Sequence, residues 1–114
     1  MSKVMEETKT ITVGTIFSRS WGYEQTNVDF YQVVEIKGQF AILRRIHTRI
    51  KEDEGRYNMA GRIVGLKDEF ITEGHFVETL RKKLQFIDGS FYIAIEGDRA
   101  YVWDGESKYC SWGY

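Results

Sequence analysis

The stretch VDFYQVVEIKGQFAILRRIHTRI, residues 28–50, decides the fold, because it predicts two antiparallel strands joined by a tight turn. Along residues 28–36 the side chains alternate between an apolar and a more polar face, which is typical of a β-strand. Lys37 and Gly38 are predicted to form the turn, since glycine readily adopts the positive φ of a short hairpin turn. Residues 39–50 then form the returning strand, and the hairpin becomes the centre of the predicted fold.

On either side of this hairpin, short segments rich in β-forming residues are separated by turn signals. Residues 8–17 predict a strand, and residues 18–27 predict a polar loop that leads into the hairpin. Proline is absent, so the turns depend on glycine, Asp and Asn. The strands predicted beyond the hairpin cover residues 62–66, 69–72, 90–95, 99–103 and 108–112.

Residues 76–86 fit two structures. Leu80 and Leu84 are four residues apart, which permits a helix, but the alternation from Leu80 to Phe86 also fits a strand. We favour a strand because the neighbouring segments are β, and we keep one short helix around residues 76–85 as the alternative. The predicted fold class is mainly β, either a single small antiparallel barrel or a strongly bent meander sheet.

The length of 114 residues fits one domain with one core. We expect residues 1–7 to be a disordered N-terminus and residues 8–114 to form a single β-rich domain. The formal net charge of −1 gives no overall reason to expect a nucleic acid or an anionic membrane as partner. No apolar run approaches the ~18 residues that cross a bilayer, and no secretory signal is evident. Cys110 is the single cysteine, so we expect a cytoplasmic location.

Residue types that occur in active sites are present, but not in catalytic or metal-binding patterns. His47, His75 and Cys110 show none of the spacings CxxC, HxxxH or HExxH that typify metal sites. The chain has no nucleophile elbow and no phosphate-binding glycine loop. We therefore predict a protein that is not an enzyme and that has no metal or cofactor.

The most promising binding surface lies in SWGYEQTNVDFYQVV, residues 20–34, which joins a polar, aromatic loop to a strand. Tryptophan and tyrosine offer large, stiff contact areas, and amides and carboxylates give direction. A structural explanation is equally available, because Trp21 and Tyr23 could cap the open end of a barrel. Asp29 and Tyr31 are expected to point outward. The candidate partner-binding residues are Trp21, Tyr23, Gln25, Asn27, Asp29 and Tyr31.

A basic strand face offers an alternative, nucleic-acid-binding site. Basic residues cluster over residues 44–51 and again over residues 81–83, where they could contact phosphates. Exposed aromatic rings could stack on bases. Acidic residues follow the first cluster directly, so a solvated face with cross-strand ion pairs is the simpler explanation. The nucleic-acid-binding candidates are Arg45, Arg49, Lys82 and Lys83.

Two motifs resemble a known family. SWGYEQTNVDFYQV at residues 20–33 and WDG at residues 103–105 resemble the SWGY-[DE]-QTN-x-DFYQV signature and the C-terminal W-D-G motif of small bacteriophage and mobile-element proteins. Residues 52–85 match no part of the family's pattern. The resemblance implies a gene from a phage or an integrated element in a bacterial host, and it brings no activity, cofactor or site residues.

These features favour a non-enzymatic binding protein that acts by occupying a host protein, with a defence or regulatory protein as the expected target. The alternatives are a nucleic-acid-binding accessory protein and a protein that holds a small nucleotide-like ligand between Trp21 and Tyr23. A membrane partner is not expected. A C-terminal edge strand leaves a dimer open.

Overall fold

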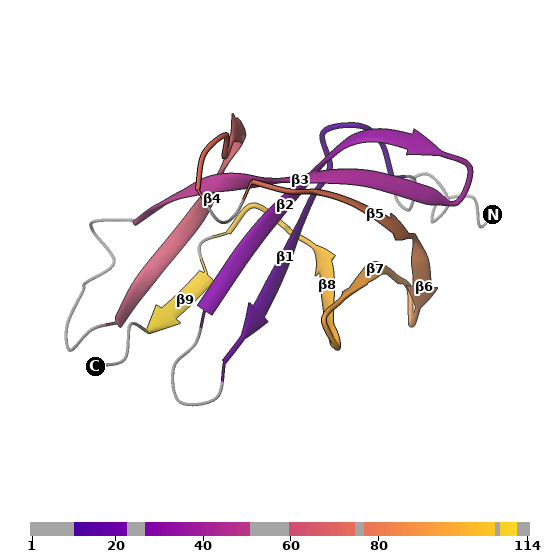
Figure 1. The fold of residues 1–114 in the computed structure, drawn as a ribbon. Coiled ribbons are helices and arrows are strands. Elements are labelled where there is room, and N and C mark those ends of the chain that lie inside the picture. Colours follow the sequence, from indigo (N-terminus) through magenta and orange to yellow (C-terminus); the bar gives the residue numbers. More distant parts are fainter. Residues whose placement is uncertain (1–10, 23–26, 51–59, 75–76, 107, 112–114) are drawn as a thin grey trace.

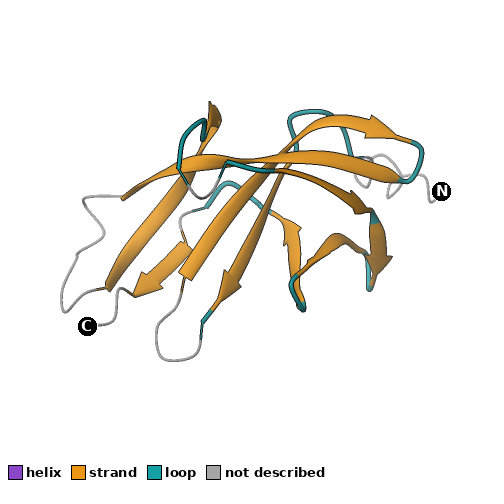
Figure 2. Cartoon of the chain, viewed as in Figure 1, coloured by secondary structure: helices purple, strands orange, loops and turns teal. Residues whose placement is uncertain are grey.

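A computed structural model describes residues 11–22, 27–50, 60–74, 77–106 and 108–111, which form nine strands and no helix (Figures 1 and 2). The predicted disordered N-terminus, residues 1–7, lies outside these ranges. The strands are β1 (Ile16–Trp21), β2 (Asn27–Lys37), β3 (Phe40–Ile50), β4 (Ala60–Phe70), β5 (Thr79–Lys83), β6 (Gln85–Ile87), β7 (Ser90–Ile95), β8 (Asp98–Val102) and β9 (Lys108–Ser111).

The strands pair in the order β6-β7-β8-β1-β2-β3-β4-β9, and every pairing is antiparallel. Strands β4 and β5 lie end to end along β3, where β5 pairs with residues 40–44 and β4 with residues 46–50. Strand β5 continues through Leu84 directly into β6. Because β5 pairs with β3 and β6 pairs with β7, residues 79–87 connect the middle of the bent sheet to its end (Figure 1). The prediction of an antiparallel, strongly bent sheet is confirmed, whereas a closed barrel is not formed.

The central hairpin is confirmed. Lys37 and Phe40 face each other at the end of the hairpin, so the turn is Gly38-Gln39, one residue later than the predicted Lys37-Gly38, and Gly38 has a φ of 61° that favours glycine. One extra residue sits between Val33 and Glu35, where the register shifts. Such a bulge increases the local twist and helps the sheet to curl.

Strand β2 is buried on both faces. On one face, the bent sheet brings β7 and β8 over β2 and forms a first core. On the other face, β4 packs against β2 and forms a second core. The first core comprises Phe17, Tyr31, Val33, Ala41, Leu43, Ile93, Ile95 and Ala100. The second core comprises Ile16, Val28, Phe30, Ile46 and Ile63.

The prediction that Asp29 and Tyr31 point outward is therefore wrong, since only 6% and 1% of their surfaces are exposed. Alternation along one strand assigns each residue to a face, but it does not say whether the second face is covered. Here the curl of β7 and β8 toward β1 covers the face that carries Tyr31.

The first strand lies further along the chain than predicted. Residues 11–15 form no strand, because the chain turns where Thr15 N donates to Thr12 O at 3.1 Å and Gly14 adopts a φ of 103°. Strand β1 instead covers residues 16–21, so four residues of the predicted loop, residues 18–21, are in the sheet. Polar side chains made this segment resemble a loop, although its pairing with β2 and β8 explains the strand.

The two short strands predicted at residues 62–66 and 69–72 are one long strand, β4. Its register against β3 jumps from Gly65 to Phe70, so residues 66–69 bulge out. The amide of Gln32 holds this bulge, because its Nε2 donates to Asp68 Oδ1 at 2.8 Å and its Oε1 accepts from Asp68 N at 2.7 Å.

The remaining strand predictions agree with the structure. Residues 79–83 and 85–87 are the strands β5 and β6, so the preference for a strand over a helix is confirmed for the described part of residues 76–86. Strands β7 and β8 lie where they were predicted, to within one residue. Strand β9 ends the pairing order beside β4, as an edge strand of the described sheet.

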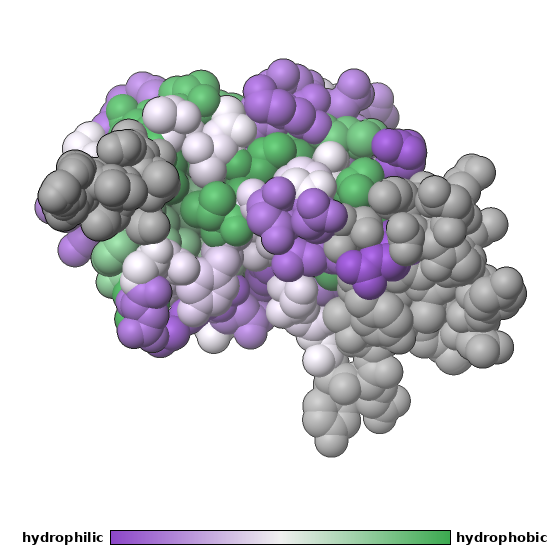
Figure 3. All heavy atoms as spheres, turned by 180° about the vertical axis from the view of Figure 1, so that it is seen from behind, coloured by the Kyte–Doolittle hydropathy of each residue, from purple (hydrophilic) through white to green (hydrophobic). Residues whose placement is uncertain are grey.

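Some large hydrophobic side chains remain at the surface. Seen from behind, hydrophobic groups lie between hydrophilic ones (Figure 3). The most exposed of them are Val13, Trp21, Val77, Phe86, Ile87, Tyr101 and Val102. Two of these aromatic residues, Trp21 on β1 and Tyr101 on β8, each contact polar or charged side chains.

Candidate functional site

The predicted partner-binding residues that the structure describes lie on the adjacent strands β1 and β2. The register pairs Trp21 with Asn27 and Arg19 with Asp29, so these four side chains share one face of the sheet. Tyr31 lies on the same face, opposite Phe17. Tyr23 and Gln25 lie outside the described residues.

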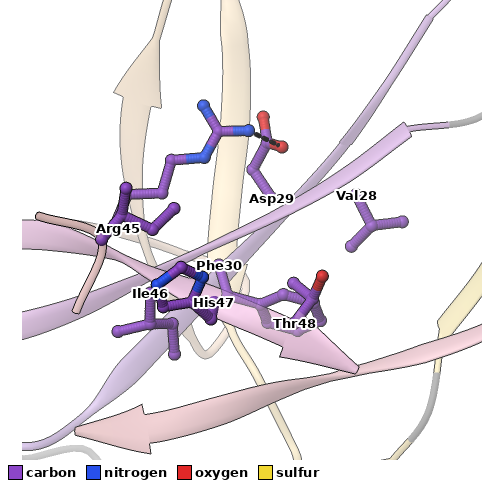
Figure 4. A pocket seen from close by; sticks show the side chains of 8 residues that line it. Val28, Asp29, Phe30, Arg45, Ile46, His47 and Thr48 are labelled. Atoms are coloured by element: carbon purple, nitrogen blue, oxygen red, sulfur yellow. Dashed lines mark hydrogen bonds and ion pairs between the residues drawn. The ribbon is translucent and has the colours of Figure 1, made fainter. Parts of the chain in front are cut away.

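The carboxylate of Asp29 is the centre of this group. Trp21 Nε1 donates a hydrogen bond of 2.8 Å to its Oδ2, and Arg45 Nη2 donates to its Oδ1 (Figure 4). Arg19 Nη1 lies 3.9 Å from Oδ2. Both carboxylate oxygens therefore accept from, or lie close to, cationic or indole N–H groups, which is how a buried charge is compensated.

Arg19 links this group to β8, the strand on the other side of β1 from β2. Its Nε and Nη2 lie 3.1 and 2.9 Å from Asp98 Oδ2 at the start of β8, and Nη2 is 3.6 Å from Glu96 Oε1. The guanidinium also lies 5.1 Å from the centre of the Trp21 ring, within the range of a cation–π contact. We call Arg19, Trp21, Asp29, Arg45 and Asp98 the Asp29 cluster.

The cluster holds one aromatic ring in a fixed place at the surface. Trp21 is 40% exposed, although its indole N–H is engaged by buried Asp29 and Arg19 lies against its ring. Two arginines face two carboxylates, so the cluster carries no excess charge of its own. Its accessible side chains are the Trp21 indole and the partly exposed Asp98 carboxylate, and of the two the indole offers the large contact area that suits another surface.

Tyr31 packs beneath the Asp29 cluster. Burial raises the pKa of its hydroxyl above the usual 10.0, and the Asp29 carboxylate raises it further, while Arg45 and Arg19 oppose the rise. The Arg45 guanidinium lies 5.9 Å from the centre of the Tyr31 ring.

This raised pKa predicts a loss of stability in alkali. The folded state holds the Tyr31 proton more tightly than the unfolded state, so the stability that this group contributes is complete below pH 10 and is lost as the pH rises through the folded-state pKa. Urea unfolding between pH 8 and 11 should show a steeper decline for the natural protein than for Tyr31→Phe. Equal slopes would contradict the assignment.

A pocket of about 250 Å³ adjoins the cluster, where β2 and β3 separate (Figure 4). The two strands pair as far as Tyr31 and Arg45, beyond which β2 pairs with β1 and β3 pairs with β4. The pocket is lined by Val28, Asp29, Phe30, Arg45, Ile46, His47, Thr48 and Ile71. The pocket thus has an apolar floor and a polar rim, and Asp29 and Arg45 belong both to it and to the cluster.

The four nucleic-acid-binding candidates are not brought together. Arg45 is bonded to Asp29, and Arg49 lies in the half of β3 that pairs with β4. Lys82 and Lys83 pair with Ala41 and Phe40 at the other end of β3. The eight residue steps from position 41 to position 49 span about 26 Å in a strand, and adjacent lysines on a strand point to opposite faces.

Neither a metal site nor a membrane-crossing helix emerges from the described part of the chain. Among those residues, no three or more His, Cys, Asp or Glu side chains are grouped so that they could hold a metal ion. His75 lies outside them. No helix there is long and apolar enough to cross a membrane.

Comparison with known proteins gives this chain no relative: no family model, no curated protein and no solved structure matches it.

Proposed function

We propose that this is a non-enzymatic binding protein that acts by occupying another protein, and that the surface around Trp21 makes the contact. One observation carries the proposal: Trp21 presents its ring to solvent while its N–H is bonded to a buried carboxylate. A free tryptophan side chain can turn inward or sample several rotamers, whereas this one is held at the surface by Asp29 and Arg19.

An aromatic ring held in this way favours tight association. Tryptophan is among the residues that contribute most to protein interfaces. Ordering a flexible side chain on binding costs about 0.5–1.5 kcal/mol, and a ring that is already fixed avoids most of that cost. The positive and negative charges of the Asp29 cluster balance, so the cluster suits a protein surface better than a polyanion.

The resemblance to phage and mobile-element proteins supports the choice of partner. We propose that the protein works in the cytoplasm of a bacterial host and blocks a host defence or regulatory protein. Occupation of such a target requires no reaction, in keeping with a chain whose motifs indicate no catalytic group.

The test is capture of a partner from bacterial host lysate, with and without nuclease, followed by affinity measurement on the captured protein. Trp21→Ala should weaken binding at least about 30-fold, the effect of an interface residue worth 2 kcal/mol, and should leave the β circular dichroism intact. Val13→Ala, which removes an exposed apolar side chain outside the cluster, is the matched control and should bind normally.

Two outcomes would point to the alternative functions. Capture that nuclease abolishes would indicate nucleic acid as the partner. A rise of the unfolding midpoint with added nucleotide, lost in Trp21→Ala, would indicate the small-ligand alternative. A folded Trp21→Ala protein that still binds its partner would remove the surface from consideration.

A further inference from the structure

A second surface, on the other side of the bent sheet from the Asp29 cluster, combines aromatic and basic side chains. Ala41, Leu80, Ile93 and Ala100 point into or pack against the first core, so the residues that alternate with them on β3, β5, β7 and β8 point away from it. We call this the outer surface. Its aromatic and basic members are Phe40, Arg81, Lys83, Tyr92, Arg99 and Tyr101.

Tyr92 and Tyr101 form a cross-strand pair at the centre of β7 and β8. Their ring centres are 5.7 Å apart, and the rings are tilted by 47°. The Arg99 guanidinium lies 4.9 Å from the centre of the Tyr92 ring, and its Nη1 donates to the Tyr101 hydroxyl at 3.4 Å. Tyr92 also donates to Gln85 Oε1 at 3.3 Å. Two phenol rings and a guanidinium thus form one ordered group at the surface.

A second pair of cations lies on β5, which pairs with β3 and continues through Leu84 into β6, the partner of β7. The guanidinium of Arg81 is 4.0 Å from the centre of the Phe40 ring, and Lys83 is exposed beside Phe40 across the β3–β5 ladder. Like Arg99, Arg81 lies over an aromatic ring. Arginine stacked in this way keeps donors free for phosphate oxygens.

The outer surface is poor in carboxylates, although the whole chain has more acidic than basic residues. Strands β5, β6 and β7 contain no Asp or Glu, and β8 contains only Asp98. Asp98 bonds to Arg19 on the opposite face of the sheet. Asp88 and Glu96 lie in the turns that flank β7. The net charge of −1 therefore conceals a local surface that favours anions.

We propose that the outer surface binds single-stranded nucleic acid, with bases stacked on Tyr92 and Tyr101 and phosphates held by Arg81, Lys83 and Arg99. Sheet surfaces with aromatic rings flanked by cations bind single strands in this way, because an unpaired base exposes a flat face that a duplex hides. Of the four nucleic-acid-binding candidates predicted from the sequence, this site includes only Lys83, and it does not involve Trp21.

Fluorescence anisotropy with labelled 20-mers of oligo-dT and oligo-U tests the proposal on the full chain. Both single strands should bind more tightly than a duplex of the same length. Tyr101→Ala should weaken binding about 5- to 150-fold, the range expected for loss of one stacked base, whereas Tyr101→Phe, which keeps the ring, should bind almost normally.

The charge variants separate this surface from general attraction. Arg81→Gln with Lys83→Gln should weaken binding and reduce the slope of log K against log salt by about 1.4, which is 0.7 for each lost phosphate contact. The matched control, Lys67→Gln with Lys108→Gln, makes the same charge change on β4 and β9, outside the outer surface, and should retain affinity and slope.

Three results would overturn the proposal: no binding of either oligonucleotide, equal affinity for duplex and single strand, or equal losses in the two double variants. Trp21→Ala should bind oligonucleotides as the natural protein does, so failure here is distinct from failure of the proposed protein-binding function. If Tyr101→Ala does not fold, the comparison between the double variant of the exposed Arg81 and Lys83 and its control still tests the proposal.

Discussion

Replacing Asp29 with alanine is expected to lower the free energy of unfolding by about 3–5 kcal/mol, the usual effect of breaking a buried ion pair from one side. Arg45 and Arg19 would remain close together without the carboxylate between them, and the indole N–H of Trp21 would lose its acceptor. In a small domain, whose total stability is about 5–15 kcal/mol, a loss of this size brings the protein close to unfolding.

Chemical denaturation followed by circular dichroism measures this loss. Asp29→Asn, which keeps the shape but not the charge, should fall between the natural protein and the alanine variant. The matched control is Glu35→Gln, which removes an exposed carboxylate 3.6 Å from Lys37 and should change stability by less than about 1 kcal/mol. Similar losses in Asp29→Ala and Glu35→Gln would mean that the cluster does not stabilise the fold.

The same variant links the fold to the proposed function. If Asp29 holds Trp21 in place, then Asp29→Asn should weaken partner binding even where the protein is folded, because the Trp21 ring becomes free to move. Stability and recognition would then depend on the same carboxylate, which explains why a residue in a binding motif can be buried.

Local signals were enough to predict the hairpin and most of the strands. Glycine marked both turns: Asp88-Gly89 is a turn as predicted, and the turn predicted at Lys37-Gly38 lies one residue later, at Gly38-Gln39. The class of fold followed from short strands with short connections. Beyond this, the position of β1 was missed, because its polar residues gain their strand structure from pairing with β2 and β8.

The candidate site was predicted only in part. The sequence drew attention to Trp21 and Asp29, but not to Arg19 or Asp98, which are 79 residues apart and meet only when β8 pairs with β1. Tyr31 looked like an outward residue for the same reason, since the strands that bury it come from distant parts of the chain. The outer surface was missed because Arg81 and Arg99 become neighbours of aromatic rings only across the strand pairings.

Gly65 in β4 gives the second large expected effect, because Phe30 of β2 packs directly on its backbone. A Cβ atom at this position would lie 2.8 Å from Phe30 Cγ and 3.0 Å from Cδ2. The Phe30 ring is fully buried, and the Trp103 ring packs against it edge-on, with the two ring centres 4.8 Å apart. The Phe30 ring therefore has little room to move away from a new methyl group. Gly65→Ala should therefore lower the free energy of unfolding by about 1–3 kcal/mol, as overpacking does.

A double-mutant cycle with Phe30 separates this clash from a general effect of the substitution. Phe30→Leu alone should also destabilise the protein, because it leaves a cavity in the second core. In the double variant the smaller leucine side chain leaves space for the new methyl group, so the combined loss should be at least about 1 kcal/mol smaller than the sum of the single losses. Additive losses would show that Phe30 of β2 does not pack on β4 at Gly65.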